Sequence, residues 1–406
     1  MSYRGMSLKI SMTLMSDSEQ HVWRIADVRC GLDRGPLCGW GGWLLHQTAS
    51  QCAIMQLLLT AYERSHPMHV TTIGLDLAKN VFQVHGIDDH GEIAFNRALR
   101  RAQVLAFFER LEPCLVGIEA CGTSHHWARE LIKLGHNVKL IPPAYVKPYV
   151  KRGKSDAVDA AAICEAVTRP TMRFVEVKTP EQQAILAVHR TRDLIVRQRT
   201  QTINMLRAQL AEFGLVLPQG VYHPLQFAKD CVDGEQPDLP KNAQEVVFDL
   251  CDELLFLHAK ILRHSRHMTR IAKSEKRVAL LRTIPGVGPI TASAIVATVG
   301  SGKQFNNGRE FAAWLGLTPL NKSSGGKERL GHISKMGDQY IRRLLVLGMT
   351  SRIRSMRLEP EKFDPWFADI LSRKPSRVAA VAMANKTARM IWAVLTRNEP
   401  YKVRTV

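Results

Sequence analysis

The sequence is short of acidic residues, of long apolar runs and of paired cysteines. Its 406 residues carry 56 Lys and Arg against 37 Asp and Glu, a formal net charge of +19. No two of the eight cysteines stand in CxxC spacing, which argues against a zinc ribbon and a redox motif. We expect these cysteines to be reduced and mostly buried. The deficit of acidic residues predicts a polyanionic partner, and nucleic acid is the foremost candidate for a soluble protein.

Membrane and secretion signals are also missing. The longest apolar stretch, Cys52–Leu59, is far shorter than the roughly 20 residues that cross a bilayer. Residues 1–20 lack the continuous apolar region and cleavage site of a secretory signal. We therefore expect no membrane partner and a cytoplasmic location. With 45% hydrophobic residues the chain is globular, and its length allows two or three domains.

The first 67 residues differ from the rest in charge and texture. They hold six basic and five acidic residues, so that +18 of the net charge lies on residues 68–406. They include a CGWGGW run and show no sustained periodicity. We expect residues 1–67 to be an extension that is disordered or not native to the protein and that contributes no function.

From residue 71 the pattern predicts a mixed α/β domain. Three strands, within residues 71–79, 81–88 and 92–99, form a β-meander. A helix, a strand, a second helix and a second strand follow up to residue 143. Three antiparallel strands followed by alternating α and β elements is the order of an RNase H-like fold, which we assign to residues 70–175.

Residues 180–275 are predicted to form a helical linker with two long helices. The first spans about Pro180 to Phe213. The second, between Val247 and Ile271, places apolar residues at alternating steps of three and four, the spacing of a coiled coil, with a polar break at His264. Packing of this helix against the first one within the chain is an equally open alternative. The Pro- and Gly-rich loop between the helices is predicted to be a hinge. The first helix carries a series of arginines that favours nucleic-acid binding: Arg190, Arg192, Arg197, Arg199 and Arg207.

Residues 278–400 are predicted to form a compact, mainly α C-terminal domain. Its segment TIPGVGPITASAIVATVG is typical of a helix-hairpin-helix. Gly286 and Gly288 let the backbone approach a phosphate, and Pro289 begins a helix with free N–H groups. Such hairpins bind the backbone of DNA without reading its sequence. An ordinary αα-hairpin is the alternative.

Four carboxylates occupy positions that favour a metal site. Asp76 lies in the apolar strand IGLDLA and Glu119 ends the buried strand VGIEA, where a carboxylate is costly without compensation. Asp156 and Asp159 are three residues apart on a predicted helix and share one face, although capping of that helix is the alternative. Phosphoryl transfer commonly uses divalent cations held by carboxylates from several elements. Since Mg²⁺ prefers oxygen ligands, the four residues predict a magnesium site.

The segment NKSSGGKERLGHISKMG places hydroxyls beside glycines and cations. Ser323 and Ser324 precede two glycines, so a hydroxyl would sit on backbone that a phosphate can approach. The cations that follow would stabilise the transition state of phosphoryl transfer. A solvated loop is the alternative. These cations are Lys327, Arg329 and Lys335.

Taken together, these motifs closely resemble the DEDD transposases of insertion-sequence family one-ten, especially its subgroup eleven-eleven. The resemblance rests on IGLDLAKNVFQVHGID, GIEACGTSHHWARELIKLGHNVKLIPP and KSDAVDAAAICEA, followed by TIPGVGPITA, FAAWLGLTP and SSGGKERLGHISKMGDQYIRRLL. It implies a RuvC-like domain that binds Mg²⁺ and a C-terminal transposase domain whose nucleophilic serine matches Ser324, with Ser323 one residue off the alignment. The DEDD carboxylates match Asp76, Glu119, Asp156 and Asp159.

The resemblance also implies the partners and the reaction. The partners are the double-stranded DNA of the element ends and target, a structured guide RNA encoded by the element, and further copies of the chain in a dimer or tetramer. The expected function is that of a bacterial transposase that cleaves and exchanges DNA strands. Two alternatives are a RuvC-like, metal-dependent junction nuclease without a covalent intermediate and a non-catalytic nucleic-acid-binding protein.

Overall fold

The computed structural model describes residues 9–13, 24–29, 69–151, 153, 155–235, 237–323, 325–327, 329–356, 358 and 365–402. The chain divides into two units, Met1–His66 and Pro67–Val406. In the first unit, β1 (Lys9–Thr13) and β2 (Arg24–Arg29) form an antiparallel pair. Our expectation for the remainder of residues 1–67 lies outside the described residues.

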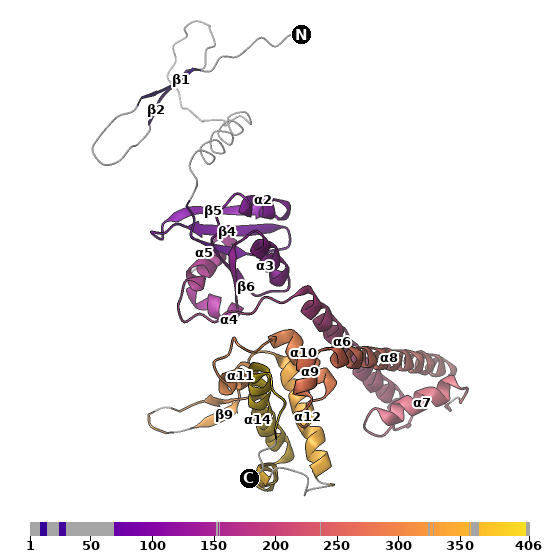
Figure 1. The fold of residues 1–406 in the computed structure, drawn as a ribbon. Coiled ribbons are helices and arrows are strands. Elements are labelled where there is room, and N and C mark those ends of the chain that lie inside the picture. The colour runs from indigo at the N-terminus through magenta and orange to yellow at the C-terminus, as the bar shows by residue number, and fades with distance from the viewer. Residues whose placement is uncertain are drawn as a thin grey trace, which may run out of the picture. The chain divides into compact units, whose positions relative to one another are not determined.

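A five-stranded sheet forms the first part of the second unit (Figure 1). The strand order is β5-β4-β3-β6-β7, with β3 antiparallel to β4 and parallel to β6. The predicted meander and the parallel strands after it are confirmed, and the order is that of an RNase H-like fold. The strands are β3 (Thr72–Asp76), β4 (Val81–Ile87), β5 (Ile93–Arg100), β6 (Leu115–Glu119) and β7 (Asn137–Ile141).

Helices cover both faces of this sheet. On one face, Ile73 and Leu75 of β3 pack with Trp127 and Leu131 of α3. On the other face, Gly74 lies directly under α5. This alternation follows from the two-residue period of a strand. The helices are η1 (Arg101–Gln103), α2 (Val104–Phe108), α3 (Ser124–Lys133), α4 (Pro143–Val146), η2 (Lys147–Tyr149) and α5 (Asp156–Val167).

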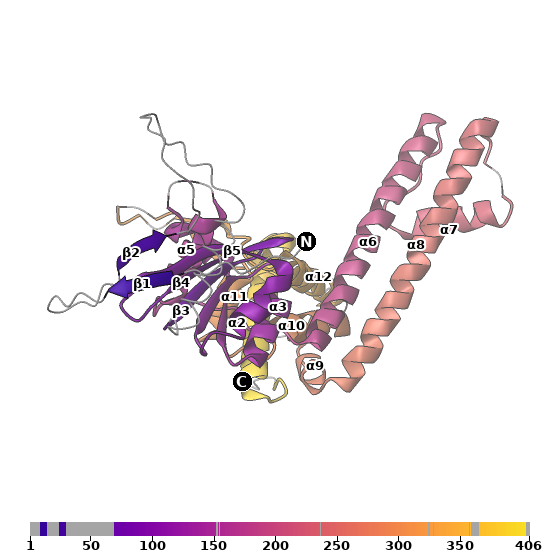
Figure 2. The ribbon, with the colours of Figure 1, turned by 90° about the horizontal axis from the view of Figure 1, so that it is seen from above.

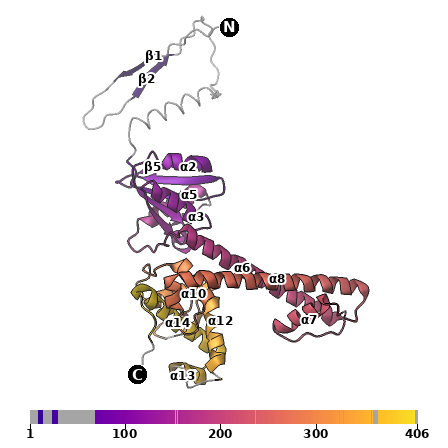
Figure 3. The ribbon, with the colours of Figure 1, turned by 45° about the vertical axis from the view of Figure 1, so that its right-hand side comes forward.

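Two long helices follow, α6 (Pro180–Glu212) and α8 (Lys241–Ser274); they run side by side in Figure 2 and overlap in the views of Figures 1 and 3. Leu257 and Ile261 from the heptad pattern of α8 pack against Ile195 of α6. The heptad face is thus covered within the chain, which is the alternative stated above, and the intermolecular coiled coil is not confirmed.

The hinge expected between α6 and α8 is wrong in its middle part, because residues there form the helix α7 (Tyr222–Val232). Pro224 stands in the first turn of α7, where the missing N–H of proline costs no hydrogen bond. Ala228 and Cys231 pack into the same cluster as α6 and α8. Burial of this face outweighs the turn-forming composition around it.

The C-terminal part is mainly helical, as expected. Its core is formed largely by α10, α12 and α14, with Ile295, Leu345, Met349 and Met383 buried together. The small sheet of β8 and β9 carries the glycine-rich segment. The elements are α9 (Lys276–Leu281), α10 (Pro289–Val299), α11 (Gly308–Trp314), β8 (Pro319–Asn321), β9 (Leu330–Ile333), α12 (Gln339–Met356), α13 (Pro365–Arg373) and α14 (Ser376–Arg397).

Within the part of the chain that the structure describes, one helix, α14, is long and apolar enough to cross a membrane by length and composition alone. Half of its most apolar window is buried inside the protein. Ala384, Ala388 and Ile391 are fully buried in the C-terminal core. The apolar composition of α14 is therefore accounted for by packing within this domain.

Candidate functional site

Asp76 and Glu119 lie side by side at one edge of the sheet. Strands β3 and β6 pair in parallel with Leu75 opposite Ile118, so the residues that follow occupy neighbouring positions at the carboxyl ends of both strands. Each of the two carboxylates is half-buried. This edge is where ligands bind in many α/β sheets.

Helix α5 brings two more carboxylates to this edge. Its N-cap is Ser155, whose hydroxyl accepts a hydrogen bond from the N–H of Val158 at 3.4 Å. The capping alternative for Asp156 is therefore wrong, because Ser155 already fills that role. Oxygen atoms of Asp76, Asp156 and Asp159 all lie within 4.8 Å of one another. Three of the four predicted carboxylates thus form one cluster, whereas Glu119 lies at the neighbouring strand end and is not a member of it.

Two glycines allow α5 to come this close. Gly74 and Gly117 are opposite each other on β3 and β6. A Cβ atom on Gly74 would stand 2.0 Å from the carbonyl oxygen of Ala160 and 2.5 Å from the backbone nitrogen of Cys164. Because both atoms belong to the backbone of α5, a side chain there would push the helix and its aspartates away. A glycine inside an apolar strand is the sequence signal for such a close approach, and it was missed above.

Burial and neighbouring negative charges raise the pKa of Asp76 and of Glu119. Burial raises the pKa of Asp76, and the charges of Asp159 and Asp156 raise it further. The pKa of Glu119 is raised by burial first and then by Asp76 and Asp159. A nearby cation offsets this repulsion and so favours the charged form of such a group. The donor atoms are all carboxylate oxygens, which fits a hard divalent cation.

A small polar pocket begins directly after Glu119. Its lining includes residues 120–122, Lys178 and Arg190. The Nδ1 atom of His125 accepts a hydrogen bond from the backbone N–H of Lys178 at 3.2 Å. Burial, with Lys178 as the next cause, lowers the pKa of His125 to about 4, so the ring is neutral at pH 7. Arg190 therefore faces a different space from the other arginines of α6.

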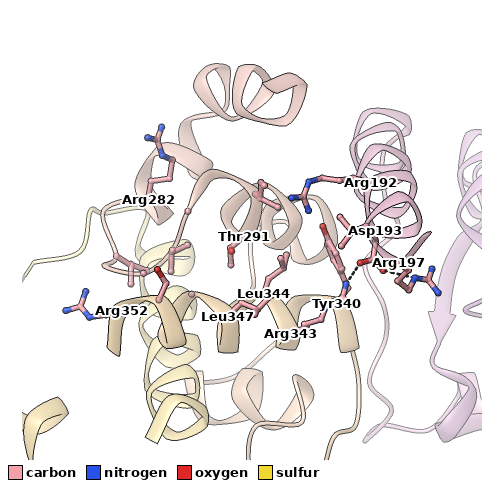
Figure 4. A pocket seen from close by; sticks show the side chains of 18 of the residues that line it. Arg192, Asp193, Arg197, Arg282, Thr291, Tyr340, Arg343, Leu344, Leu347 and Arg352 are labelled. Carbon is pink, nitrogen blue, oxygen red and sulfur yellow. Dashed lines mark hydrogen bonds and ion pairs between the residues drawn. The ribbon is translucent and has the colours of Figure 1, made fainter. Parts of the chain in front are cut away.

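Three more of the predicted arginines of α6 and the two predicted hairpin glycines line a second, larger space, whereas Arg207 lies outside it and donates hydrogen bonds to the carbonyl oxygens of Pro218 and Gly220. Arg192, Arg197, Arg199, Gly286 and Gly288 border one groove of about 1100 Å³ (Figure 4). The predicted series and the predicted hairpin are about 90 positions apart in the sequence, and the fold joins them. Three arginines absent from our sequence analysis lie there as well: Arg282, Arg343 and Arg352.

The predicted nucleophile Ser324 lies outside the described residues. Its neighbour Ser323 is engaged in the loop, because its Oγ accepts a hydrogen bond from the N–H of Arg329 at 3.0 Å. Gly325 and Gly326 have φ values of 55° and 76°, the left-handed region that glycine favours. All three predicted cations of this segment are exposed: Lys327, Arg329 and Lys335.

Comparison with known proteins gives matches in both parts of the chain. The model of a DEDD transposase domain from IS110-type elements matches residues 73–214, and the model of the transposase IS116/IS110/IS902 family matches residues 278–364. The chain is 47% identical over 336 residues to a probable family 20 transposase of Pseudomonas aeruginosa, covering 82% of this chain and 99% of the relative. It is 39% identical over 331 residues to the transposase for insertion sequence element IS1328 of Yersinia enterocolitica, covering 81% and 98%. It is 38% identical over 333 residues to the transposase for IS1111A of Coxiella burnetii, covering 82% and 92%.

Proposed function

This chain belongs to the IS116/IS110/IS902 family of transposases, and on that premise we propose that it cleaves and exchanges DNA strands with Mg²⁺ held by four carboxylates. The observation that carries the proposal is the cluster of Asp76, Asp156 and Asp159 from β3 and α5, with Glu119 at the neighbouring end of β6. A DEDD transposase domain implies the use of a divalent metal, and the all-oxygen donor set favours Mg²⁺. The ligands would be Asp76, Glu119, Asp156 and Asp159.

In this proposal the RuvC-like carboxylates and a serine divide the work. Bound Mg²⁺ would offset the negative charge of the scissile phosphate and its transition state. The Oγ atom of Ser324 attacks phosphorus, an Oγ–P bond forms, and the bond from phosphorus to one sugar oxygen breaks. The released sugar oxygen takes up a proton, and the serine proton passes to solvent. A free sugar hydroxyl of another strand then attacks the phosphoserine and restores the serine.

Trapping the covalent intermediate tests this mechanism. We expect end-labelled DNA to form an adduct with the wild-type protein that survives denaturation, and Ser324→Ala to lose both adduct and recombination. Ser323→Ala is the matched control and should keep the adduct, since its hydroxyl accepts the Arg329 N–H. An adduct that persists in Ser324→Ala and disappears in Ser323→Ala would reverse the assignment. Cleavage by the wild type without any adduct would favour the metal-dependent junction nuclease.

The partners belong to the same proposal. The chain would act in the cytoplasm on the double-stranded DNA of element ends and target, and a structured guide RNA would join the two. The surplus of +18 charges on residues 68–406 supports nucleic-acid partners. Recombination reconstituted with purified protein and DNA should require the element's RNA and should stop after ribonuclease treatment. Full activity of an RNA-free preparation would contradict the guided mechanism.

We also propose that the chain assembles as a dimer or tetramer. Because the heptad face of α8 is covered by α6, the contact between copies would use other surfaces. Light scattering of the purified protein should give a mass of two or four chains, and a monomeric mass with and without DNA would contradict this proposal.

A further inference from the structure

A groove separate from the carboxylate cluster runs between three elements of the chain. Its walls are α6, the turn between α9 and α10 at residues 282–288, and α12. Figure 4 shows Arg192 reaching in from α6, with Leu344 and Leu347 of α12 along the floor. None of the four proposed metal ligands lines this groove.

Positive charge dominates the groove. Among the described residues that line it, six are arginines, one is a carboxylate, Asp193, and none is a lysine or glutamate. Asp193 forms ion pairs with Arg343 and, at 3.7 Å, with Arg197. Burial lowers the pKa of Arg199, and the positive charge of Arg192 lowers it further. A collection of cations with so little counter-charge predicts an anionic occupant.

The turn between α9 and α10 adds backbone donors to the same groove. Gly288 is the N-cap of α10 and has no side chain that could accept a hydrogen bond, and Pro289 is the first helical residue. The N–H groups of the first turn are therefore uncapped by any side chain at this position. Oriented N–H groups at a helix N-terminus attract phosphate. The hairpin donors and the arginines thus favour the same kind of ligand.

The two glycines of this turn differ in their structural roles. Gly286 has φ +86°, and its carbonyl oxygen would stand 2.3 Å from a Cβ atom placed on Gly348 of α12. This contact seats the turn on α12. Gly288 has φ −80°, and a Cβ atom there would meet nothing within 4 Å. A side chain at position 288 therefore fits without a steric clash. A substitution of Gly288 can thus test ligand binding without disturbing the fold.

We propose that this groove binds the phosphodiester backbone of a nucleic-acid strand. The guanidinium groups and the N-terminus of α10 contact successive phosphates, while the exposed Leu347 of α12 lies against the sugars. Because the contacts go to the backbone, binding is independent of sequence. The inference rests on the proposed function, since an enzyme that exchanges strands must hold nucleic acid away from the cleaved phosphate.

Gly288→Asp is the decisive variant. Aspartate is a favoured N-cap, so the free energy of unfolding should stay equal or rise. The aspartate carboxylate would accept hydrogen bonds from the N–H groups that otherwise bind phosphate. Its negative charge would also repel the phosphate. We expect at least about tenfold weaker binding, a change of about 1.4 kcal/mol, measured by fluorescence anisotropy without divalent cations. Gly288→Asn caps the helix equally without the charge and should lose less. Unchanged affinity of Gly288→Asp would overturn the proposal.

The salt dependence of binding gives a second, independent test. Arg282→Gln should reduce the slope of log K against log salt by about 0.9, the value for one lost phosphate contact. Arg377→Gln on α14 is the control, because Arg377 is exposed and does not line the groove. An equal change of slope in both variants would overturn the assignment. Labelled duplex DNA, single-stranded DNA and RNA serve as probes, and the probe whose affinity Gly288→Asp reduces most is the occupant.

This outcome is distinguishable from failure of the proposed function. Asp76 lies outside the groove. The variant Asp76→Asn should therefore still bind nucleic acid but lose strand cleavage. If Gly288→Asp binds normally and Asp76→Asn is inactive, only the groove assignment is wrong. If Asp76→Asn recombines normally, the proposed metal site is wrong whatever the groove does.

Discussion

Asp76 shows how a residue proposed to bind a metal ion can weaken the folded state. Its carboxylate is half-buried beside two aspartates, and burial and their charges both raise its pKa. Without a cation this arrangement is repulsive, so it weakens the folded state. The same repulsion strengthens binding of a divalent cation, since the cation removes it. Residues that serve a site in this way are commonly not those that stabilise the fold best.

Asp76→Asn should therefore stabilise the metal-free protein while abolishing strand cleavage. Removing one of the repelling charges should raise the free energy of unfolding by about 1 kcal/mol or less, because solvent screens a half-exposed group. Thermal unfolding in the presence of a chelator measures this change. Asp89→Asn is the control, since Asp89 is an exposed turn residue, and it should alter neither stability nor cleavage. A lower Tm for Asp76→Asn would refute the repulsion argument.

Gly74→Ala should damage the site without touching a carboxylate. The added methyl group meets backbone atoms of α5 at 2.0 and 2.5 Å, and overpacking of this kind costs about 1–3 kcal/mol. We expect that loss in urea unfolding, together with weaker Mn²⁺ binding in calorimetry. Gly122→Ala is the matched control, because a Cβ atom there meets nothing within 4 Å. Equal stability of the two variants would mean that α5 does not depend on Gly74.

At the scale of elements, α6 connects the sheet domain to the C-terminal helices. Near its start, Arg129 of α3 donates a hydrogen bond to the carbonyl oxygen of Lys178 at 2.6 Å. Two turns into α6, the ring of His189 lies 3.0 Å from the hydroxyl of Tyr340 and 2.9 Å from that of Ser293. This helix therefore has polar contacts with both parts. The position of α6 places its arginines in the same groove as the turn between α9 and α10.

The contact of His189 predicts a pH dependence of stability. Burial, and then Arg192, lower the pKa of His189 from 6.5 to about 4. The unfolded chain therefore binds more protons between these values, and stability must rise with pH across that window. We expect Tm to be constant above pH 7 and to fall as the pH drops from about 6.5 to 4. In His189→Gln this slope should be smaller, and an identical slope would show that His189 does not titrate in this way.

At the scale of the whole molecule, the proposed metal site and the proposed nucleic-acid groove are two separate sites. The proposed metal ligands lie at the edge of the sheet. The arginines line a groove that none of these ligands borders. A groove of cations attracts phosphates directly, and a cluster of carboxylates repels them unless a cation intervenes. The net charge of +19 thus includes two sites of opposite charge.

Metal removal should therefore stop one activity and leave the other. With a chelator in excess, strand cleavage should vanish because the carboxylates then repel the phosphate. Binding of a labelled duplex at the same ionic strength should change less than about twofold, since arginines need no metal. Parallel gel and anisotropy assays measure the two quantities. Loss of binding on chelation would place the main nucleic-acid contact at the carboxylate site instead.

Local patterns in the sequence determined much of this protein. Alternating apolar residues identify the strands, and an aspartate inside IGLDLA stands out because burying a carboxylate is costly. These features depend on neighbours a few residues away, so periodicity reveals them. The RNase H-like strand order was accordingly predicted, and three of the four carboxylates proposed as metal ligands form one cluster. The helix α7 was missed because its turn-rich composition hides an apolar face that only burial makes favourable.

Partner choice between distant segments was decided by the tertiary structure alone. The heptad pattern of α8 needs an apolar partner, but only the fold shows that α6 fills that place. Arg192 and Arg343 are about 150 positions apart, and no local pattern relates them to one groove. The close approach of α5 at Gly74 likewise follows from packing between backbones. Hydrophobic burial is non-directional, so a sequence states which faces must be covered, and the three-dimensional fit selects what covers them.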